Sequence, residues 1–306
     1  MLTPTDLLRE LEPTVETLLA RHLHAAEEWF PHEYVPWEEG RSFSDDPWEP
    51  GDSTLSPIAR IALELNLLTE DNLPYYHLAI WHAFGADGAW GEWSRRWTAE
   101  EGRHSIAMRD LLTVTRALDP TELERARKEH VGRGYSPPGG AFSALDGLVY
   151  ATLQELATRI SHRGTGTITG DATADRLMRR IATDENLHYV FYRDVAATAL
   201  ALEPSAMMQA IGRQVLGFSM PGLELPGFRE KAISMAKAGI YDLRIHRDQV
   251  LMQVLFKQWR ITEVEGLDDD AERARAQVLS FLDDLDRTAT RYEERRAERE
   301  GRSTAA

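Results

Sequence analysis

The sequence of 306 residues contains no cysteine. This absence excludes disulfide bonds, zinc sites with cysteine ligands, iron–sulfur clusters and a cysteine nucleophile. The sequence also lacks any window of 18 apolar residues, so we expect no membrane-spanning helix. Its first residues, Met1–Asp6, show no basic segment followed by an apolar run. We therefore expect no signal peptide and a cytoplasmic protein.

Basic residues are in the minority. The chain has 35 Lys and Arg residues against 50 Asp and Glu residues, which gives a formal net charge of −15. This balance disfavours general attraction to nucleic acid, and an acidic partner would have to bind a local basic patch. Hydrophobic residues make up 42% of the chain, enough for a sizeable core.

Apolar residues recur with helical spacing along most of the chain, and we find no convincing strand. We predict an all-α protein with one domain over residues 1–306. Residues 1–56 form an N-terminal helix, capped by Thr5, and a covering arm. Residues 57–202 form a four-helix core. Residues 203–299 form additional C-terminal helices, and residues 300–306 form a tail. Pro74 is expected to interrupt the first core helix, and Gly164 to end the third.

One pattern occurs twice in the core: an acidic pair followed by a histidine three positions after the second acid. Glu101 and His104 belong to the first copy, and Glu185 and His188 to the second. On a helix, side chains three residues apart project from the same face. Each carboxylate and its imidazole can therefore bind the same metal ion.

A further glutamate precedes each copy at a similar distance. Glu70 lies 31 residues before Glu101, and Glu155 lies 30 residues before Glu185. This spacing predicts two helical hairpins that each supply one Glu and one Glu-x-x-His, the ligand set of ferritin-like bundles with two iron or manganese ions. The predicted metal ligands are Glu70, Glu101, His104, Glu155, Glu185 and His188. We expect Glu101 and Glu185 to bridge the two ions.

The stretches at residues 69–74, 97–104, 154–162 and 182–188 carry a clear family resemblance. They resemble the soluble acyl-[acyl-carrier-protein] desaturases of the plant stearoyl and actinobacterial types. The resemblance extends through residues 238–242 and 259–261 to residues 266–267, so it covers nearly the whole chain. The sequence departs from the family pattern at Gly102, where the family usually has Asn.

The resemblance implies an enzyme with two iron ions, manganese being the alternative in the purified protein. It implies that the enzyme uses O₂ and electrons from a ferredoxin-type donor to introduce a double bond into a saturated acyl chain. This acyl chain is carried on acyl carrier protein. The resemblance also leads us to expect a homodimer.

Three residues outside the ligand set are candidates for catalytic roles. Thr158 follows Glu155 by three residues, so its hydroxyl could donate a proton near bound O₂; otherwise it is an ordinary helix residue. Asp184 could support a metal-bound imidazole, or be a solvated acid. Trp29 matches the family position proposed to pass electrons with that Asp and a histidine, and its alternative is a packed aromatic residue.

Other residues fit structural or docking roles. We interpret His162 as a helix C-terminal cap, the tryptophans at 81, 90, 93 and 97 as packing residues, and the remaining histidines as unrelated to the ligand pattern. Two basic groups are candidates for docking the acidic carrier protein. The first consists of Arg176, Arg179 and Arg180, and the second of Arg229, Lys231 and Lys237. The expected pocket walls are Tyr76, Ala79, Ile80, Ala83, Gly147 and Tyr150.

The ligand pattern alone leaves other functions open. A related oxygenase that hydroxylates or N-oxygenates its substrate would use the same ligands, and only its product would distinguish it. An iron-storage or ferroxidase subunit is usually a shorter bundle without the arm and the C-terminal helices. A radical-generating subunit needs a tyrosine beside the metal pair, and we find none placed one turn from a ligand. A metal-free structural paralogue is disfavoured by the complete ligand set.

Overall fold

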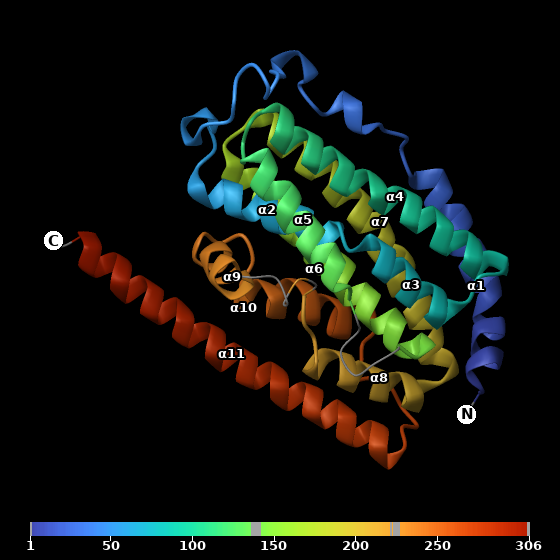
Figure 1. The fold of residues 1–306 in the computed structure, drawn as a ribbon. Helices are drawn as coiled ribbons and strands as arrows, with labels where there is room; N and C mark the ends of the chain where they lie inside the picture. The colour runs from blue at the N-terminus through green and yellow to red at the C-terminus, as the bar shows by residue number, and fades with distance from the viewer. Residues whose placement is uncertain (1, 136–141, 221, 223–226, 305–306) are drawn as a thin grey trace.

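The computed structural model describes residues 2–135, 142–220, 222 and 227–304. These residues form helices and connecting segments without a β-strand, which confirms the all-α prediction (Figure 1). The bundle is formed by α2 (Pro57–Glu70) with α3 (Leu73–Phe84), α4 (Gly88–Val114), α6 (Ala144–Thr169) and α7 (Ala172–Leu202). Among the described residues, the most extensive helix packing is between α6 and α7.

Capping side chains set the starts of the core helices. Ser56 Oγ accepts a hydrogen bond from the Ala59 amide at the start of α2, and Asp171 does the same for the Ala174 amide at the start of α7. The first core helix is interrupted between α2 and α3, immediately before Pro74, as predicted. Glu70 therefore occupies the C-terminal end of α2.

The predicted cap of the N-terminal helix is wrong. Helix α1 (Pro4–Ala25) begins after Thr3, whose hydroxyl accepts a hydrogen bond from the Asp6 amide at 3.2 Å. Thr3 rather than Thr5 is the N-cap, because Pro4 suits the first helical position, where no amide donor is needed.

The predicted end of the third core helix is also wrong. Helix α6 continues through Gly164 and Gly166 to Thr169. A Cβ atom at Gly164 would lie 2.7 Å from the carbonyl oxygen of Ile240. This glycine allows close packing against the C-terminal segment and does not end the helix.

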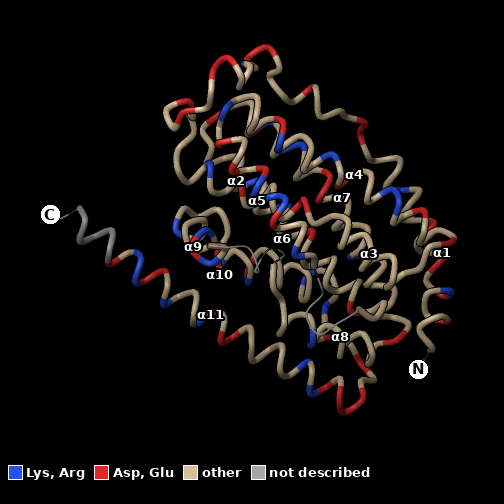
Figure 2. Tube along the Cα trace, in the orientation of Figure 1, with Lys and Arg blue, Asp and Glu red and all other residues tan. Residues whose placement is uncertain are grey.

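Additional segments cover the bundle (Figure 1). Helix α1 packs against α4 and α7, and the arm that follows contains short 3₁₀ helices, η1 (Pro31–Glu33), η2 (Trp37–Glu39) and η3 (Pro50–Asp52). Helix α5 (Pro120–Arg133) contacts α2. The arm carries many acidic residues (Figure 2).

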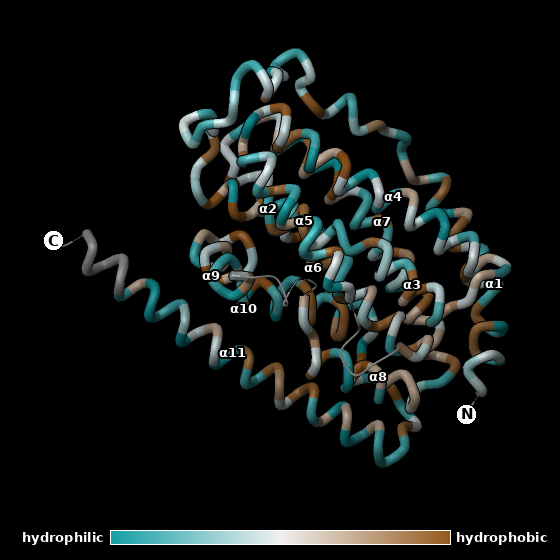
Figure 3. The backbone as a smooth tube through the Cα atoms, in the orientation of Figure 1, coloured by the Kyte–Doolittle hydropathy of each residue, from teal (hydrophilic) through white to brown (hydrophobic). Residues whose placement is uncertain are grey.

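The C-terminal part consists of α8 (Pro204–Leu216), α9 (Phe228–Lys237), α10 (Leu243–Ile245), the π-helical segments η4 (His246–Leu251) and η5 (Gln253–Gln258), and α11 (Asp269–Thr304). Helix α11 buries an apolar stripe that includes Val278 and Leu282, and hydrophobic and hydrophilic segments alternate along it (Figure 3). It extends past the predicted boundary at residue 299. Among the described residues, no helix combines the length and apolar composition needed to cross a membrane.

Candidate metal centre

The bundle brings the six predicted metal ligands together in its interior. All six are buried, and their ligand atoms form two overlapping groups. The first group contains Glu70 and His104, and the second contains Glu155 and His188. Both groups contain Glu101 and Glu185. This overlap matches the expected arrangement of two ions joined by two bridging carboxylates.

Both histidines direct Nδ1 toward the carboxylates. His188 Nδ1 lies 2.8 Å from Glu101 Oε1 and 3.5 Å from Glu155 Oε2. His104 Nδ1 lies 3.2 Å from Glu185 Oε1 and 3.4 Å from Glu101 Oε2. The four helices thus place two imidazole nitrogens and several carboxylate oxygens around one small volume.

The donor atoms fit a pair of metal ions. Five of the six predicted ligands contain a buried atom that lacks a hydrogen-bond partner of acceptable geometry. These atoms are Glu101 Oε1, His104 Nδ1, Glu155 Oε2, Glu185 Oε1 and His188 Nδ1. Buried polar atoms are costly when unsatisfied. Carboxylate oxygens with neutral imidazole nitrogens form a donor set that suits iron or manganese, and ion binding would satisfy these atoms.

The close approach of several acidic groups in the centre shifts their pKa values. Burial and repulsion from Glu185 raise the pKa of Glu155 well above its usual range, and the same causes raise the pKa of Glu101. Burial also disfavours ionised Glu70, but the neighbouring imidazoles of His104 and His162 outweigh it and lower the pKa of Glu70. Without an ion the centre therefore holds protons that metal binding would release.

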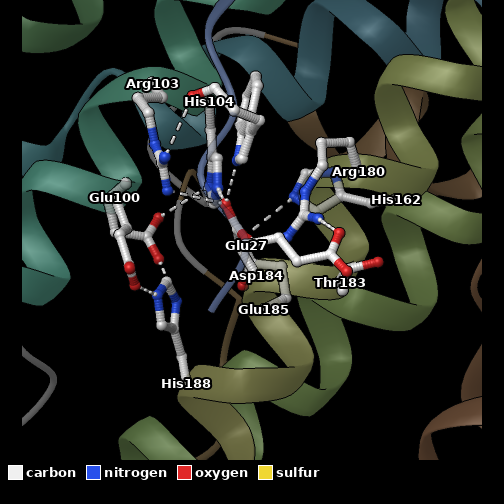
Figure 4. A network of polar contacts seen from close by, with 12 residues as sticks. Glu27, Glu100, Arg103, His104, His162, Arg180, Thr183, Asp184, Glu185 and His188 are labelled. Carbon is white, nitrogen blue, oxygen red and sulfur yellow. Dashed lines mark hydrogen bonds and ion pairs between the residues drawn. The ribbon is translucent and has the colours of Figure 1, made fainter. Parts of the chain in front are cut away.

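Asp184 lies next to the centre, at the end of the Trp29 side chain. The Asp184 Oδ2 atom accepts a hydrogen bond from Trp29 Nε1 at 2.8 Å and lies 3.4 Å from His104 Nε2. Arg103 and Arg180 pair with the same carboxylate (Figure 4). Burial opposes its ionisation, but the hydrogen bond and charge of His104, with the charge of Arg180, lower the pKa of Asp184.

Glu100 is a buried residue whose environment the sequence did not reveal. Its Oε2 atom lies 2.9 Å from His188 Nε2 and 2.9 Å from His22 Nε2, while Arg96 pairs with its Oε1 atom. Figure 4 shows Glu100 facing His188. Its position in the repeat could have indicated this role, because Glu100 directly precedes the ligand Glu101 in the same way that Asp184 directly precedes the ligand Glu185.

The interpretation of His162 needs correction. His162 is not a C-terminal cap, because α6 extends beyond it and its Nε2 atom lies 3.0 Å from Glu70 Oε1. Its position seven residues after Glu155, two turns along the same helix face, was the available signal. Trp97 packs in the core as expected, and its Nε1 atom also donates a hydrogen bond to Glu155 Oε1 at 2.9 Å.

The statement that no tyrosine lies one turn from a ligand is also wrong. Tyr192 follows His188 by four residues, and its side chain is fully buried. Its hydroxyl has no hydrogen-bond partner of acceptable geometry, and its ring meets Trp93 edge-on at 5.5 Å.

Thr158 lies at the boundary between the centre and a pocket. Its hydroxyl oxygen is 2.8 Å from Glu185 Oε2 and 3.0 Å from the carbonyl oxygen of Gln154. The hydroxyl has one proton, so it can donate either to the carboxylate or to the helix backbone. The structure thus places Thr158 beside a candidate bridging ligand.

A mainly apolar pocket adjoins the centre between α3 and α6. All six wall residues expected from the sequence line it: Tyr76, Ala79, Ile80, Ala83, Gly147 and Tyr150. Glu70, Glu101, Glu155 and Thr158 also line it. Gly147 packs closely against α3 in the pocket wall, because a Cβ atom there would lie 3.2 Å from Phe84 Cζ. An extended apolar group in this pocket would lie directly against the candidate ligands.

The first basic group is only partly exposed, and its side chains have partners within the protein. Arg180 is buried and pairs with Asp184. Arg179 pairs with Asp175, and Arg176 donates to the Glu33 carbonyl oxygen. The prediction that Arg180 contacts a carrier protein is therefore wrong, because its charge is used inside the protein.

The second basic group lies on α9 (Figure 2). Lys231 pairs with Glu64 at 2.8 Å, whereas the side chains of Arg229 and Lys237 are exposed.

Comparison with known proteins shows the same pattern along nearly the whole chain. A family model described as fatty acid desaturase matches residues 3–306. The chain is 46% identical to DesA1 of Mycobacterium tuberculosis, provisionally named an acyl-[acyl-carrier-protein] desaturase, over 99% of this chain and 93% of DesA1. It is 29% identical to acyl-[acyl-carrier-protein] desaturase 7, chloroplastic, of Oryza sativa subsp. japonica, over 98% of this chain and 80% of the rice protein.

A solved structure shares the fold. The X-ray structure of DesA2 from Mycobacterium tuberculosis H37Rv superposes with a TM-score of 0.69 at 28% sequence identity. The match covers 88% of this chain and 99% of the DesA2 chain.

Proposed function

Because this chain belongs to the fatty acid desaturase family, we propose that it introduces a double bond into a saturated acyl chain carried on acyl carrier protein. The observation that carries the proposal is the shared wall between the apolar pocket and the candidate metal centre, formed by Glu70, Glu101 and Glu155. An acyl chain in this pocket would place its carbons beside the metal ligands. The names of the bacterial and rice relatives support the carrier-bound substrate.

The metal ions in this proposal are two iron ions. Glu70 and His104 would hold one, Glu155 and His188 the other, and Glu101 and Glu185 both. Iron fits this mixed set of oxygen and nitrogen donors, as does manganese. When bound and reduced, two iron ions would supply the chemistry that activates O₂ for hydrogen removal from two adjacent carbons.

The side chains of the pocket would bind and orient the substrate. The apolar walls on α3 and α6 would exclude water from the acyl chain, and Gly147 lets the two helices approach closely there. The Thr158 hydroxyl can direct its proton toward the pocket by turning away from Glu185. The hydrogen bond between Trp29 and Asp184 links the arm to His104, and these residues would form the last part of a path for electrons to the centre.

Two partners complete the proposal. A ferredoxin-type protein would supply the electrons, and acyl carrier protein would present the substrate. The exposed Arg229 and Lys237 side chains on α9 are the candidate docking contacts for the acidic carrier protein. We also propose a homodimer.

A reconstitution experiment tests this function. The protein is loaded anaerobically with iron, given O₂ and a reduced ferredoxin, and offered acyl carrier proteins that carry saturated chains of different lengths. Mass spectrometry should find a product that has lost two hydrogens, and the Glu185→Ala variant, which lacks a bridging ligand, should form none. A product that has gained one oxygen would instead identify a hydroxylase. Iron oxidation without any change in the acyl chain would identify a ferroxidase.

A further inference from the structure

The two halves of the centre support their histidines by a cross-connection. Asp184 immediately precedes the ligand Glu185 on α7 but contacts His104 on α4. Glu100 immediately precedes the ligand Glu101 on α4 but contacts His188 on α7. Each repeat therefore supplies a carboxylate to the histidine of the other repeat.

The contacts of Glu100 fix the protonation of His188. Glu100 Oε2 lies 2.9 Å from the Nε2 atoms of both His188 and His22. A carboxylate oxygen only accepts hydrogen bonds, so both imidazoles must carry a proton on Nε2. In the neutral ring of His188, Nδ1 is then unprotonated, and it is the atom that faces Glu101 and Glu155.

Both carboxylate oxygens of Glu100 have nitrogen partners. Its side chain is buried, and its Oε2 atom faces His188 and His22. Arg96 pairs with the second oxygen, Oε1. These contacts hold the carboxylate in place beside both imidazoles.

His22 comes from α1, outside the four-helix core. Its ring stacks on His188 at 5.8 Å and meets Trp93 edge-on at 5.0 Å. Its side chain is buried, although α1 is otherwise an amphipathic covering helix. A polar side chain at this place is explained by its contact with Glu100.

We propose that Glu100 and His22 are positioning residues that hold His188 in its Nε2–H tautomer, and so set the affinity of the metal position formed by Glu155 and His188. The proposal rests on the metal pair of the proposed function. Carboxylate partners of ligand histidines orient the ring and make it a stronger ligand. The Glu70 and His104 position has its own support from Asp184, so the two positions should respond separately to substitution.

A Co²⁺ titration of the metal-free protein tests the proposal. The parent chain should bind two ions. His22→Phe keeps the ring contacts but removes the donor to Glu100, and should weaken one of the two binding steps by roughly 10-fold to 100-fold while shifting the visible Co²⁺ spectrum. His22→Gln, which retains an N–H donor, should restore most of the affinity. His24→Phe is the matched control, because His24 is exposed on the same helix and should leave both steps unchanged.

Three results would overturn the proposal. The first is that His22→Phe binds both ions with the affinities and the spectrum of the parent. The second is that both His22 variants weaken the two binding steps equally, which would mean that α1 only supports the fold. Finally, the parent chain could bind fewer than two ions, which would contradict the metal pair itself. The first result, in contrast, would leave the metal pair in place and contradict only the role of His22 and Glu100.

Discussion

The indole Nε1 of Trp29 donates a hydrogen bond to Asp184 Oδ2 at 2.8 Å, across 155 residues of sequence. The same carboxylate oxygen lies 3.4 Å from His104 Nε2. The arm that follows α1 is thus connected through one carboxylate to a candidate metal ligand. Arg103 lies over the indole at 4.9 Å, which holds the ring in a cationic environment.

Replacing Trp29 tests this connection. Trp29→Phe removes the hydrogen bond but leaves an aromatic ring, so the metal content should stay at the parent level. Reduction of the metal centre by reduced ferredoxin, followed by stopped-flow absorbance, should slow by about 10-fold or more. Trp37→Phe is the control, because Trp37 is 48% exposed on the arm and has no contact with Asp184. Equal reduction rates in both variants would assign Trp29 to packing alone.

Much of the fold and of the centre was accessible from the sequence because the pattern is local. A carboxylate and a histidine three residues apart must share a helix face, and two such pairs at matching spacing imply two hairpins. The contacts of Glu100, His22 and His162 were not accessible in this way. They join different helices, and their pairing depends on how α1, α4, α6 and α7 pack, which no single helix encodes.

The wrong predictions for Gly164 and Arg180 have a similar origin. Gly164 has the local preference of a helix terminator, but its missing side chain is used for contact with Ile240. Arg180 has the spacing of an exposed basic face, but a tertiary contact with Asp184 buries it. In both cases a partner distant in sequence determined the role of the residue.

The Thr158 hydroxyl provides a second prediction. Thr158→Val keeps the shape of the side chain but removes its hydrogen bond to Glu185 at 2.8 Å. Fold and iron content should match those of the parent, whereas a larger fraction of consumed O₂ should be released without double-bond formation. The ratio of O₂ consumed to product formed measures this coupling. An unchanged ratio would show that the hydroxyl only caps its helix backbone.

The pocket wall at Gly147 predicts substrate preference. In Gly147→Leu, the new side chain would start 3.2 Å from Phe84 Cζ and 3.4 Å from Ala83 Cβ, and so would press on α3 and reduce the pocket. We expect kcat/KM to fall by roughly 10-fold or more for the longest accepted acyl chain and to change less for shorter chains. Gly132→Leu is the control, because a Cβ atom there meets nothing within 4 Å. A uniform loss for all chain lengths would contradict the prediction.

His246 predicts how stability depends on pH. Burial lowers the pKa of His246 to about 4, while its Nδ1 lies 2.7 Å from the Tyr241 hydroxyl. The unfolded chain, with the ordinary histidine pKa of about 6.5, binds a proton more readily than the folded chain. Acidification therefore favours unfolding, and stability is lost as the pH falls from about 6.5 toward 4.

The size of this effect follows from the shift. Between pH 7 and pH 5 the parent should lose about 2 kcal/mol more than His246→Gln, which has no group that titrates there. Urea denaturation at the two pH values measures the difference. His82→Gln, altered at an exposed histidine on α3, should behave like the parent. Parallel losses in the parent and His246→Gln would show that other groups dominate the pH dependence.

The last prediction concerns docking of the acidic carrier protein. The chain itself carries a net charge of −15, so association requires a local basic surface. Arg229 and Lys237 are exposed on α9, which packs against α2, the helix that bears Glu70. The double variant Arg229→Glu with Lys237→Glu should raise KM for the acyl carrier substrate by roughly 3-fold to 10-fold at low salt, with unchanged iron content.

The salt dependence separates docking from a general charge effect. Screening should shrink the difference in KM as ionic strength rises to about 0.15 M and above, because the Debye length then falls to about 8 Å. The control is Arg9→Glu with Arg273→Glu, which adds the same negative charge on α1 and α11. If the control raises KM as much as the α9 variant does, net charge alone explains the effect. A KM that is the same in the α9 variant and the parent at every salt concentration would place the docking surface elsewhere.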